Sequence, residues 1–197
     1  MWNERYSGKD YFYGKDPNDF LRENIHQIQA GSRVLCLAEG EGRNAVFIAS
    51  TVRQSKVTAV DGSSTGLEKT HLLAAEKNVT IETVCADLND FDLGIGQWDA
   101  IVSIWCHLPS ELRKRVHAGV VRALKPNGSF LLEAYTPAQL KHTTGGPKSE
   151  DMLMTLEGLR TELSGLHLIV GQEIERTVLE GQGHTGLSAV VQVIARK

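Results

Sequence analysis

The sequence has no long apolar run and no run of basic residues, and these absences exclude several classes of protein. Its longest apolar stretches are strand-sized, so no segment is expected to span a membrane. No apolar signal core follows the N-terminal Met-Trp-Asn-Glu-Arg-Tyr. The net charge is -3 and no Lys/Arg cluster occurs, which argues against nucleic acid or an anionic membrane as a partner. We therefore expect a globular cytoplasmic protein.

Cysteine is scarce and has no metal-binding spacing. The three cysteines, Cys36, Cys85 and Cys106, lie separately within apolar stretches. We expect them to be buried free thiols in a reducing compartment, and we expect no metal site. A length of 197 residues with 41% hydrophobic residues suits one domain. That domain would span 1–197, with an N-terminal lid and helix in 1–30 and the core in 31–197.

Short apolar runs alternate with amphipathic stretches along most of the chain. Gly, Pro and Asp residues separate these segments, as in a chain that changes element at each turn. Such alternation is typical of parallel βαβ units in a doubly wound sheet. The pattern predicts helices at 19–29, 43–52, 63–76 and 110–124, and strands at 34–38, 56–60, 80–86, 99–104 and 129–135.

The C-terminal part follows a different pattern. After a predicted helix at 150–163, strand-like runs at 168–179 and 187–195 are separated only by the turn-rich segment 180–186. This spacing predicts a hairpin, which adds an antiparallel pair to the parallel strands. The expected fold is a three-layer α/β sandwich with seven strands, Rossmann-like in its parallel part.

A glycine-rich turn follows the first predicted strand. Gly40 and Gly42 would allow positive φ and let a ligand approach bare backbone at a helix N-terminus. The pattern Gly40-x-Gly42-x-x-Ala45, with Asp61 further on, also fits a dinucleotide-binding fingerprint. A nicotinamide-dependent oxidoreductase is therefore an alternative, although the chain has no Tyr-x-x-x-Lys pair and little room for a substrate domain.

Two aspartates end neighbouring predicted strands. Asp61 is placed to bind both hydroxyls of a ribose, although an Asp before Gly62 also suits a plain turn. Asp87 could accept from the exocyclic amine of an adenine, while the Leu88 amide donates to its ring. An Asx turn in Asp87–Asp90 is the structural alternative.

The segment from Val34 to Asn44 resembles the first motif of class I S-adenosylmethionine-dependent methyltransferases. Asp61, Asp87-Leu88 and Leu124–Gly128 resemble the later motifs of that superfamily, in order, and the hairpin resembles its antiparallel seventh strand. The resemblance covers essentially the whole chain and implies S-adenosylmethionine as cofactor. The cofactor-binding residues it implies are Ala38, Glu39, Gly40, Gly42, Asn44, Asp61, Gly62, Asp87, Leu88, Ile104 and Tyr13.

Within this superfamily the chain is most similar to the tellurite-resistance-type and thiopurine-methyltransferase-like group. Its N-terminal lid is resembled by Trp2–Tyr6, Tyr13-Gly14 and Pro17–Leu21. The segment from Glu133–Pro137 through Gly145–Pro147 also resembles bacterial members of the group. The lid aromatics could face a cationic sulfonium or simply pack on the sheet. The resemblance implies a small, soft methyl acceptor, such as a thiol or a selenium or tellurium oxyanion. Monomer and homodimer both remain open.

Two positions depart from the superfamily pattern. Cys36 stands where an acidic residue is usual, and Ala38 stands where glycine is usual. Cys36 cannot hold the cofactor ammonium by charge, so Glu39 or the Gly40 carbonyl would have to do so. This departure is the one feature that favours a cofactor-binding module without catalysis.

Methyl transfer needs alignment and exclusion of water more than acid–base help. The fourth and fifth strands end at the expected cleft, which makes nearby polar and aromatic residues candidates. His107 could be a base, a cofactor contact or a structural residue before Pro109. Arg176 and His184 could bind an anionic substrate, or Arg176 could pair with Glu173 or Glu175. The catalytic candidates are His107, Trp105, Tyr135 and Arg176.

Overall fold

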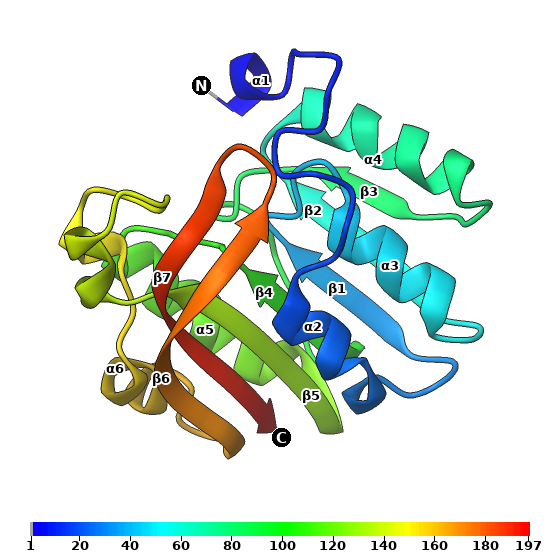
Figure 1. Cartoon of the computed structure of the whole chain (residues 1–197). Helices are drawn as coiled ribbons and strands as arrows, with labels where there is room; N and C mark the ends of the chain where they lie inside the picture. Colours follow the sequence, from blue (N-terminus) through cyan, green and yellow to red (C-terminus); the bar gives the residue numbers. More distant parts are fainter. Residues whose placement is uncertain (1) are drawn as a thin grey trace.

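The computed structural model describes residues 2–197 and contains one seven-stranded sheet with the order β3-β2-β1-β4-β5-β7-β6 (Figure 1). The first five strands are mutually parallel, and β7 runs antiparallel to both β5 and β6. The expected fold class is confirmed. The strands are β1 Arg33–Leu37, β2 Lys56–Asp61, β3 Glu82–Cys85, β4 Trp98–Ile104, β5 Leu124–Tyr135, β6 His167–Glu180 and β7 His184–Arg196.

Helices cover both faces of the sheet. Apolar residues of α2, α3 and α4 pack on one face, and those of α5 and α6 pack on the other, which gives three layers. No helix within residues 2–197 is long and apolar enough to cross a membrane. The helices are α1 Trp2–Arg5, α2 Asp19–Glu23, α3 Arg43–Thr51, α4 Ser64–Glu76, α5 Ser110–Ala123 and α6 Leu156–Glu162.

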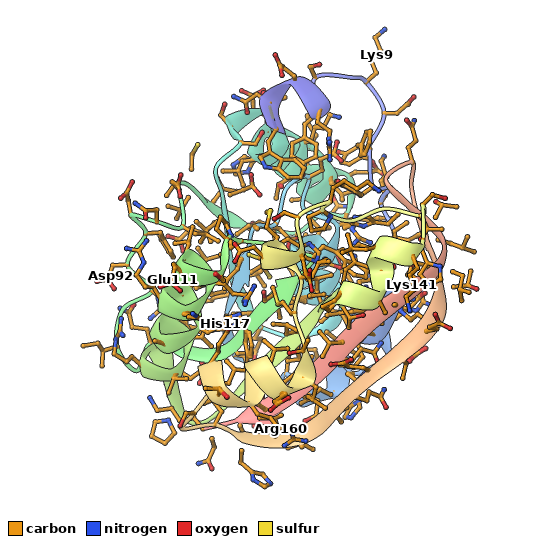
Figure 2. The ribbon with its side chains drawn as sticks, turned by 90° about the vertical axis from the view of Figure 1, so that its left-hand side faces the viewer. Lys9, Asp92, Glu111, His117, Lys141 and Arg160 are labelled. Carbon is orange, nitrogen blue, oxygen red and sulfur yellow. The ribbon has the colours of Figure 1, made fainter. Side chains whose placement is uncertain are left out.

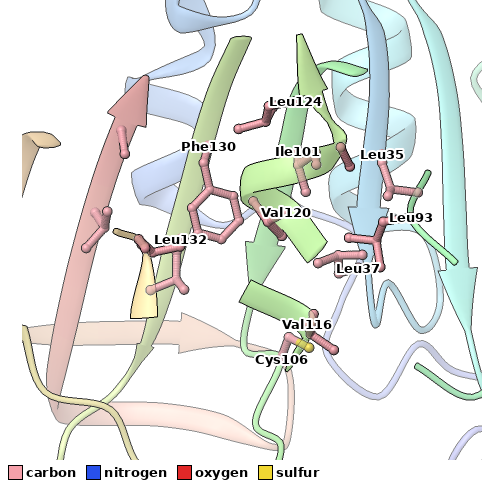
Figure 3. Close-up of a cluster of buried hydrophobic side chains, with 14 of the residues drawn as sticks. Leu35, Leu37, Leu93, Ile101, Cys106, Val116, Val120, Leu124, Phe130 and Leu132 are labelled. Carbon is pink, nitrogen blue, oxygen red and sulfur yellow. The ribbon is translucent and has the colours of Figure 1, made fainter. Parts of the chain in front are cut away.

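The larger apolar cluster lies between the sheet and α5 (Figure 3). Val120 of α5 meets Leu35 and Leu37 of β1 and Phe130 of β5, and all four are at most 1% exposed. Burial of each such side chain contributes about 1.5–3 kcal/mol. Figure 2 views this side of the molecule, with Glu111 labelled on α5 and Arg160 on α6. This packing fixes the strands whose ends form the site.

Two predicted helices are shorter than expected. The helix predicted at 19–29 ends at Glu23, because the Asn24 side chain and its own N–H both donate to the Phe20 carbonyl, and a 3₁₀ turn follows at Ile25–Gln27. The helix predicted at 150–163 is a 3₁₀ turn at Glu150–Met152 and then α6. The break occurs where the Met154 N–H bonds to the Tyr135 carbonyl of β5.

The strands differ from the prediction at their ends. β3 is an edge strand of four residues, and Cys85 at its end is exposed, so the prediction of three buried cysteines is wrong for Cys85. β5 begins at Leu124, because the predicted turn 125–128 forms a bulge between two paired regions. The hairpin turn contains only 181–183, and β6 and β7 continue into the segment predicted as loop.

Candidate active site

The carboxyl ends of the parallel strands open on a cavity of about 680 Å³. This volume lies in the usual range for small-molecule sites, and the position is the one expected of an open α/β sheet. The N-terminal segment and the β6–β7 hairpin tip lie at this same end (Figure 1). Within the part of the chain that the structure describes, no group of His, Cys, Asp and Glu could hold a metal ion.

The glycine turn after β1 is a tight loop that lies behind the cavity wall. Gly40 has φ +64° and Gly42 has φ +87°, which is backbone geometry that favours glycine. The Gly40 N–H donates to Asp61 Oδ2 at 2.8 Å and thereby joins the loop to the end of β2. A Cβ on Gly40 would lie 2.7 Å from the Tyr6 hydroxyl. Both glycines therefore shape the loop, but neither lines the cavity.

Four carboxylates line the cavity, and three of them lie at successive strand ends, namely Glu39, Asp61 and Asp87. Asp61 is 8% exposed, and burial raises its pKa although the Ser63 and Gly40 amides donate to it. Burial also raises the pKa of Glu39, to about 7, against the opposing effect of the Ala45 N–H that donates to its Oε1. Asp87 Oδ1 accepts from the Asn89 N–H, so the Asx turn considered from the sequence is present.

Two lining residues have positive φ without being glycine. Ala38 follows β1 with φ 49°, and Trp105 follows the neighbouring β4 with φ 58°. The left-handed region costs about 1–2 kcal/mol for a residue with a Cβ. Strain of this kind concentrates at functional sites. Here both strained residues turn the chain at the floor of the cavity.

Aromatic rings form the half of the cavity beyond β4. Trp105 lies 4.9 Å from His184 between ring centroids, and His184 lies 4.6 Å from Tyr13. Tyr135 is 0% exposed and stacks behind Trp105 at 4.4 Å. Tyr135 does not line the cavity, so the expected substrate-facing position is not observed. Its ring supports the indole from behind.

His107 lines the cavity, but backbone groups occupy both of its ring nitrogens. Its Nδ1 lies 3.0 Å from the Trp105 carbonyl, and its Nε2 accepts from the Tyr135 N–H at 3.0 Å. This pair fixes the neutral tautomer with the proton on Nδ1. Burial lowers the pKa of His107 to about 3. The ring is therefore held as a neutral bridge between the ends of β4 and β5.

Arg176 lies in a buried polar cluster and not at the cavity mouth. Its Nε and Nη2 donate to the two oxygens of Glu133 at 2.8 Å each, and Nη1 is 3.3 Å from Asp19 Oδ2. Glu133 is 0% exposed, so a bidentate arginine satisfies a carboxylate that would otherwise be buried without a counter-ion. Arg176 pairs with neither Glu173 nor Glu175, and it does not line the cavity where an anionic substrate would bind. Both roles considered from the sequence are therefore wrong.

Glu180 joins this cluster to the cavity. It is 5% exposed and accepts from Trp105 Nε1 at 2.6 Å and from Asn18 Nδ2 at 2.8 Å, and it pairs with Arg43. Arg43, His184 and Trp105 outweigh the effect of its burial and lower its pKa to about 2. One carboxylate thus joins the hairpin, the helix after the glycine turn and the tryptophan of the cavity.

The N-terminal segment closes the cavity through a second buried ion pair. Glu41 accepts from the Phe12 N–H at 2.8 Å and from Lys69 Nζ at 2.7 Å, and Lys69 also donates to the Asp10 carbonyl. Tyr6 is 5% exposed above the glycine turn. The segment is therefore packed on the core in this structure, with Met1 outside the described residues.

Most of the residues expected at the cofactor site meet around the one cavity, together with two of the catalytic candidates. Gly40, Gly42, Tyr135 and Arg176 stand apart from its lining. The sequence analysis missed Arg5, Phe12, Glu41 and Arg43, although the last two flank Gly42. The expected residues that line the cavity are Ala38, Glu39, Asn44, Asp61, Gly62, Asp87, Leu88, Ile104, Tyr13, Trp105 and His107.

Comparisons with known proteins agree with this geometry. A family model described as a methyltransferase domain matches residues 34–128. No curated protein matches. TehB from Haemophilus influenzae superposes with a TM-score of 0.72 at 18% identity, over 90% of this chain and 61% of that one. A SAM-dependent methyltransferase from Aquifex aeolicus superposes with a TM-score of 0.70 at 15% identity, over 98% of this chain and 97% of that one. Another from Methanosarcina mazei superposes with a TM-score of 0.69 at 16% identity, over 89% of this chain and 96% of that one.

Residues 34–128, just under half of the chain, match a methyltransferase domain, which supports an S-adenosylmethionine-dependent methyltransferase. The family match carries this conclusion, and the superpositions, all below 25% identity, show the shared fold. The residues present fit the cofactor, because carboxylates at three strand ends line one cavity of suitable size. The cofactor of this class is S-adenosylmethionine, and the nicotinamide alternative is set aside.

Proposed function

We propose that this enzyme methylates a small, soft nucleophile, with a thiol as the first candidate and selenium or tellurium oxyanions as further ones. The observation that carries the proposal is the division of the cavity into two chemically different halves. The strand-end half is lined by the carboxylates Glu39, Asp61 and Asp87. The half beyond Trp105 is lined by aromatic rings and glycines, with His184 and Arg5.

The acidic half suits the cofactor. In the proposal, Glu39 binds the ammonium, Asp61 the ribose hydroxyls, and Asp87 with the Leu88 amide the adenine, in the order of the strand ends. Gly62, Ile104 and Asn44 would complete the walls. S-adenosylmethionine, when bound, supplies a sulfonium methyl group that is transferred in line to the acceptor. The protein's own part is to hold both reactants close and to exclude water.

The aromatic half suits a small acceptor that is neutral or anionic. The Arg5 guanidinium stands over the Trp2 and Phe12 rings at 4.8 and 5.3 Å, and the one lining carboxylate beside Phe12, that of Glu41, is neutralised by its ion pair with Lys69. A thiolate or an oxyanion would meet positive charge there, and a cationic amine would not. The TehB superposition is a likeness of fold that is consistent with such an acceptor. We propose that residues 2–30 act as the lid over this half.

An acceptor screen tests the proposal. Purified protein is incubated with S-adenosylmethionine and, separately, with alkyl and aryl thiols, selenite, tellurite, small amines and catechols, and S-adenosylhomocysteine release is measured. Turnover with thiols or chalcogen oxyanions supports the proposal, and turnover confined to amines or catechols would refute it.

The cofactor half is tested separately by ligand-induced stabilisation. S-adenosylmethionine should raise the unfolding midpoint, whereas NAD should not. Asp61→Ala should weaken S-adenosylmethionine binding at least about tenfold, but it also removes the acceptor of the Gly40 and Ser63 amides. Asp61→Asn, which keeps one acceptor oxygen, separates these effects. Unchanged affinity in both variants would remove the ribose assignment.

A further inference from the structure

His184 has a buried ring nitrogen without a hydrogen bond at the floor of the aromatic half. The side chain is 8% exposed, and its Nδ1 has no partner among the residues that the structure describes. Glu180 Oε2 is the nearest acid, 3.8 Å from Nδ1, which is too far for a hydrogen bond. Within residues 2–197 no hydrogen bond is made by Nε2 either. Since buried polar groups are nearly always satisfied, a small shift that brings Nδ1 to Glu180 is expected, and Nε2 is left without a partner among the described residues.

We propose that His184 is the general base that takes the proton of the methyl acceptor, and that Glu180 is its positioning residue. The proposal rests on the proposed function and names the group that activates the acceptor. A carboxylate on one imidazole nitrogen and a substrate proton on the other is the arrangement by which histidine acts as a base. Such contacts are often long before substrate binds, and a shift of about 1 Å would close this one.

Glu180 is fixed before any substrate arrives. Its oxygens are held by Arg43, Asn18 and Trp105, so the carboxylate cannot turn away from the imidazole. The Trp105 and Tyr13 rings pack beside the His184 ring, with their centroids 4.9 and 4.6 Å from its own. The ring therefore has a defined place between a charged group behind it and the cavity in front.

The two cavity histidines differ in what their nitrogens can do. Both nitrogens of His107 are bonded to the backbone, so it has no free atom for an acceptor proton. Neither nitrogen of His184 makes a hydrogen bond to another residue of 2–197. The base that the sequence analysis considered at His107 is thus better assigned to His184, from the hairpin that it treated as a substrate-binding turn.

The proton and electron balance of the step is complete without another reactant. The proton of the acceptor passes to His184 while the lone pair left on the acceptor bonds the methyl carbon. The electrons of the carbon–sulfur bond return to sulfur, which leaves neutral S-adenosylhomocysteine and a methylated acceptor. The imidazolium, next to the Glu180 carboxylate, later gives the proton to water.

The surroundings of His184 keep it neutral, as a base must be. Burial is the main cause that lowers its pKa, and Arg43 and Arg5 act in the same direction, while Glu180 opposes them. Activity should therefore fall only on the acid side, as His184 becomes protonated. The titratable and charged groups that face it from all neighbouring elements are Arg5, Tyr13, Arg43, His107, Tyr135 and Glu180.

Acceptors of graded acidity test this inference. His184→Gln and the wild type are compared with 4-nitrothiophenol, which is ionised at neutral pH, and with 2-mercaptoethanol, which is mostly protonated like a free cysteine with pKa of about 8.5. His167→Gln is the matched control, because His167 is exposed at the opposite end of the same hairpin. His184→Ala with added imidazole, and binding of S-adenosylhomocysteine, complete the set.

For 2-mercaptoethanol we expect His184→Gln to lower kcat at least about 100-fold. For 4-nitrothiophenol we expect a loss below about fivefold, with S-adenosylhomocysteine affinity unchanged. Imidazole should restore part of the His184→Ala activity. Glu180→Gln should move the acid limb of the rate profile to lower pH.

Equal losses with both thiols, no loss with 2-mercaptoethanol, or no rescue by imidazole would overturn the inference and leave the proposed function standing. Wild-type enzyme that turns over only acceptors already ionised would do the same. A wild type without turnover on any thiol or chalcogen oxyanion would refute the proposed function itself, and this inference with it.

Discussion

The indole Nε1 of Trp105 donates to Glu180 Oε2 at 2.6 Å, across 75 positions of sequence. The same tryptophan has φ 58°, which costs about 1–2 kcal/mol for a residue with a Cβ. A hydrogen bond to a buried charge is worth about 1.5–3 kcal/mol. The bond and the stacking on Tyr135 together offset the strain. The hairpin thereby holds a cavity residue of β4 in a conformation that its own segment disfavours.

A double-mutant cycle measures this relationship. Trp105→Phe keeps a stacking ring and removes the indole donor, and Glu180→Gln keeps an acceptor and removes the charge. We expect a coupling free energy of about 1.5–3 kcal/mol from urea unfolding. Trp2→Phe, at an exposed position of α1, should show no coupling to Glu180→Gln. If the stability losses of the two single variants sum to that of the double variant within about 0.5 kcal/mol, the bond contributes little.

Glu39 predicts a pH dependence of cofactor binding. Burial raises its pKa to about 7, so below that pH the free enzyme has it mostly protonated. A bound ammonium, which stays protonated below about pH 7.7, would favour the carboxylate and lower this pKa. Binding should therefore release a proton near pH 6, and affinity should rise up to about tenfold per unit from pH 5 to 7 and then level off.

Calorimetry in buffers of different ionisation enthalpy checks the proton release directly. Glu39→Gln is the control, since an amide cannot titrate and its affinity should be nearly flat over the same range. The opposite sign, with tighter binding at pH 5 than at pH 7, would place the ammonium away from Glu39. Glu39 is the candidate for binding the ammonium because Cys36, at the usual acidic position, carries no charge. Cys36 is buried, and burial raises its pKa well above the normal value.

The fold could be read from the sequence because its signals are local and repeat in order. Apolar runs and glycine turns indicated where seven strands lie along the chain, and Ser63 caps α4, with its side chain accepting from the Gly66 N–H. The errors lie where tertiary contacts override the local pattern. Cys85 has an apolar neighbourhood in sequence but ends an edge strand, which has a neighbouring strand on one side only.

The site was only partly predictable for a related reason. Asp61 and Asp87 lie at the cavity because parallel strands end at one edge, a rule that requires only chain order. The environment of Arg176 depends on Glu133, 43 positions away, and no periodicity records which side chains two distant strands bring together. The same holds for Glu180 and His184, whose chemistry depends on their partners across the sheet.

Ala38 gives a prediction about the strain at the end of β1. Its φ of 49° is unstrained only for glycine, so Ala38→Gly should remove about 1–2 kcal/mol of strain. The greater conformational freedom of glycine in the unfolded chain should cost about 0.5–1 kcal/mol. We expect a net gain of about 0.5–1 kcal/mol in the free energy of unfolding. Denaturant titration of the two proteins measures it.

A matched substitution separates strain from function. Gln54 has φ 58° in a turn away from the cavity, so Gln54→Gly should stabilise by a similar amount and leave cofactor affinity unchanged. The cofactor affinity of Ala38→Gly, at the cavity wall, is measured under the same conditions. If Ala38→Gly is destabilising while Gln54→Gly is not, the alanine methyl packs usefully and the strain argument fails for that position.

Glu41 predicts how firmly the N-terminal segment is held. Its carboxylate accepts from the Phe12 N–H and pairs with Lys69 at 2.7 Å, and it is 4% exposed. Removing one partner of a buried pair costs about 3–5 kcal/mol when the other stays buried, but Lys69 can reach solvent if the segment detaches. We therefore expect Glu41→Ala to release the segment rather than to unfold the core. Trypsin should then cleave faster at Lys9 and Lys15, before Asn18, under native conditions.

Lys114→Ala, which breaks an exposed pair with Glu111 on α5, is the control and should leave cleavage unchanged. S-adenosylmethionine should slow the cleavage of the wild type more than that of Glu41→Ala, because the cofactor can stabilise the closed segment only while Glu41 holds it. Equal cleavage of Glu41→Ala and wild type would show that Tyr6 and the other aromatic contacts hold the segment without this ion pair.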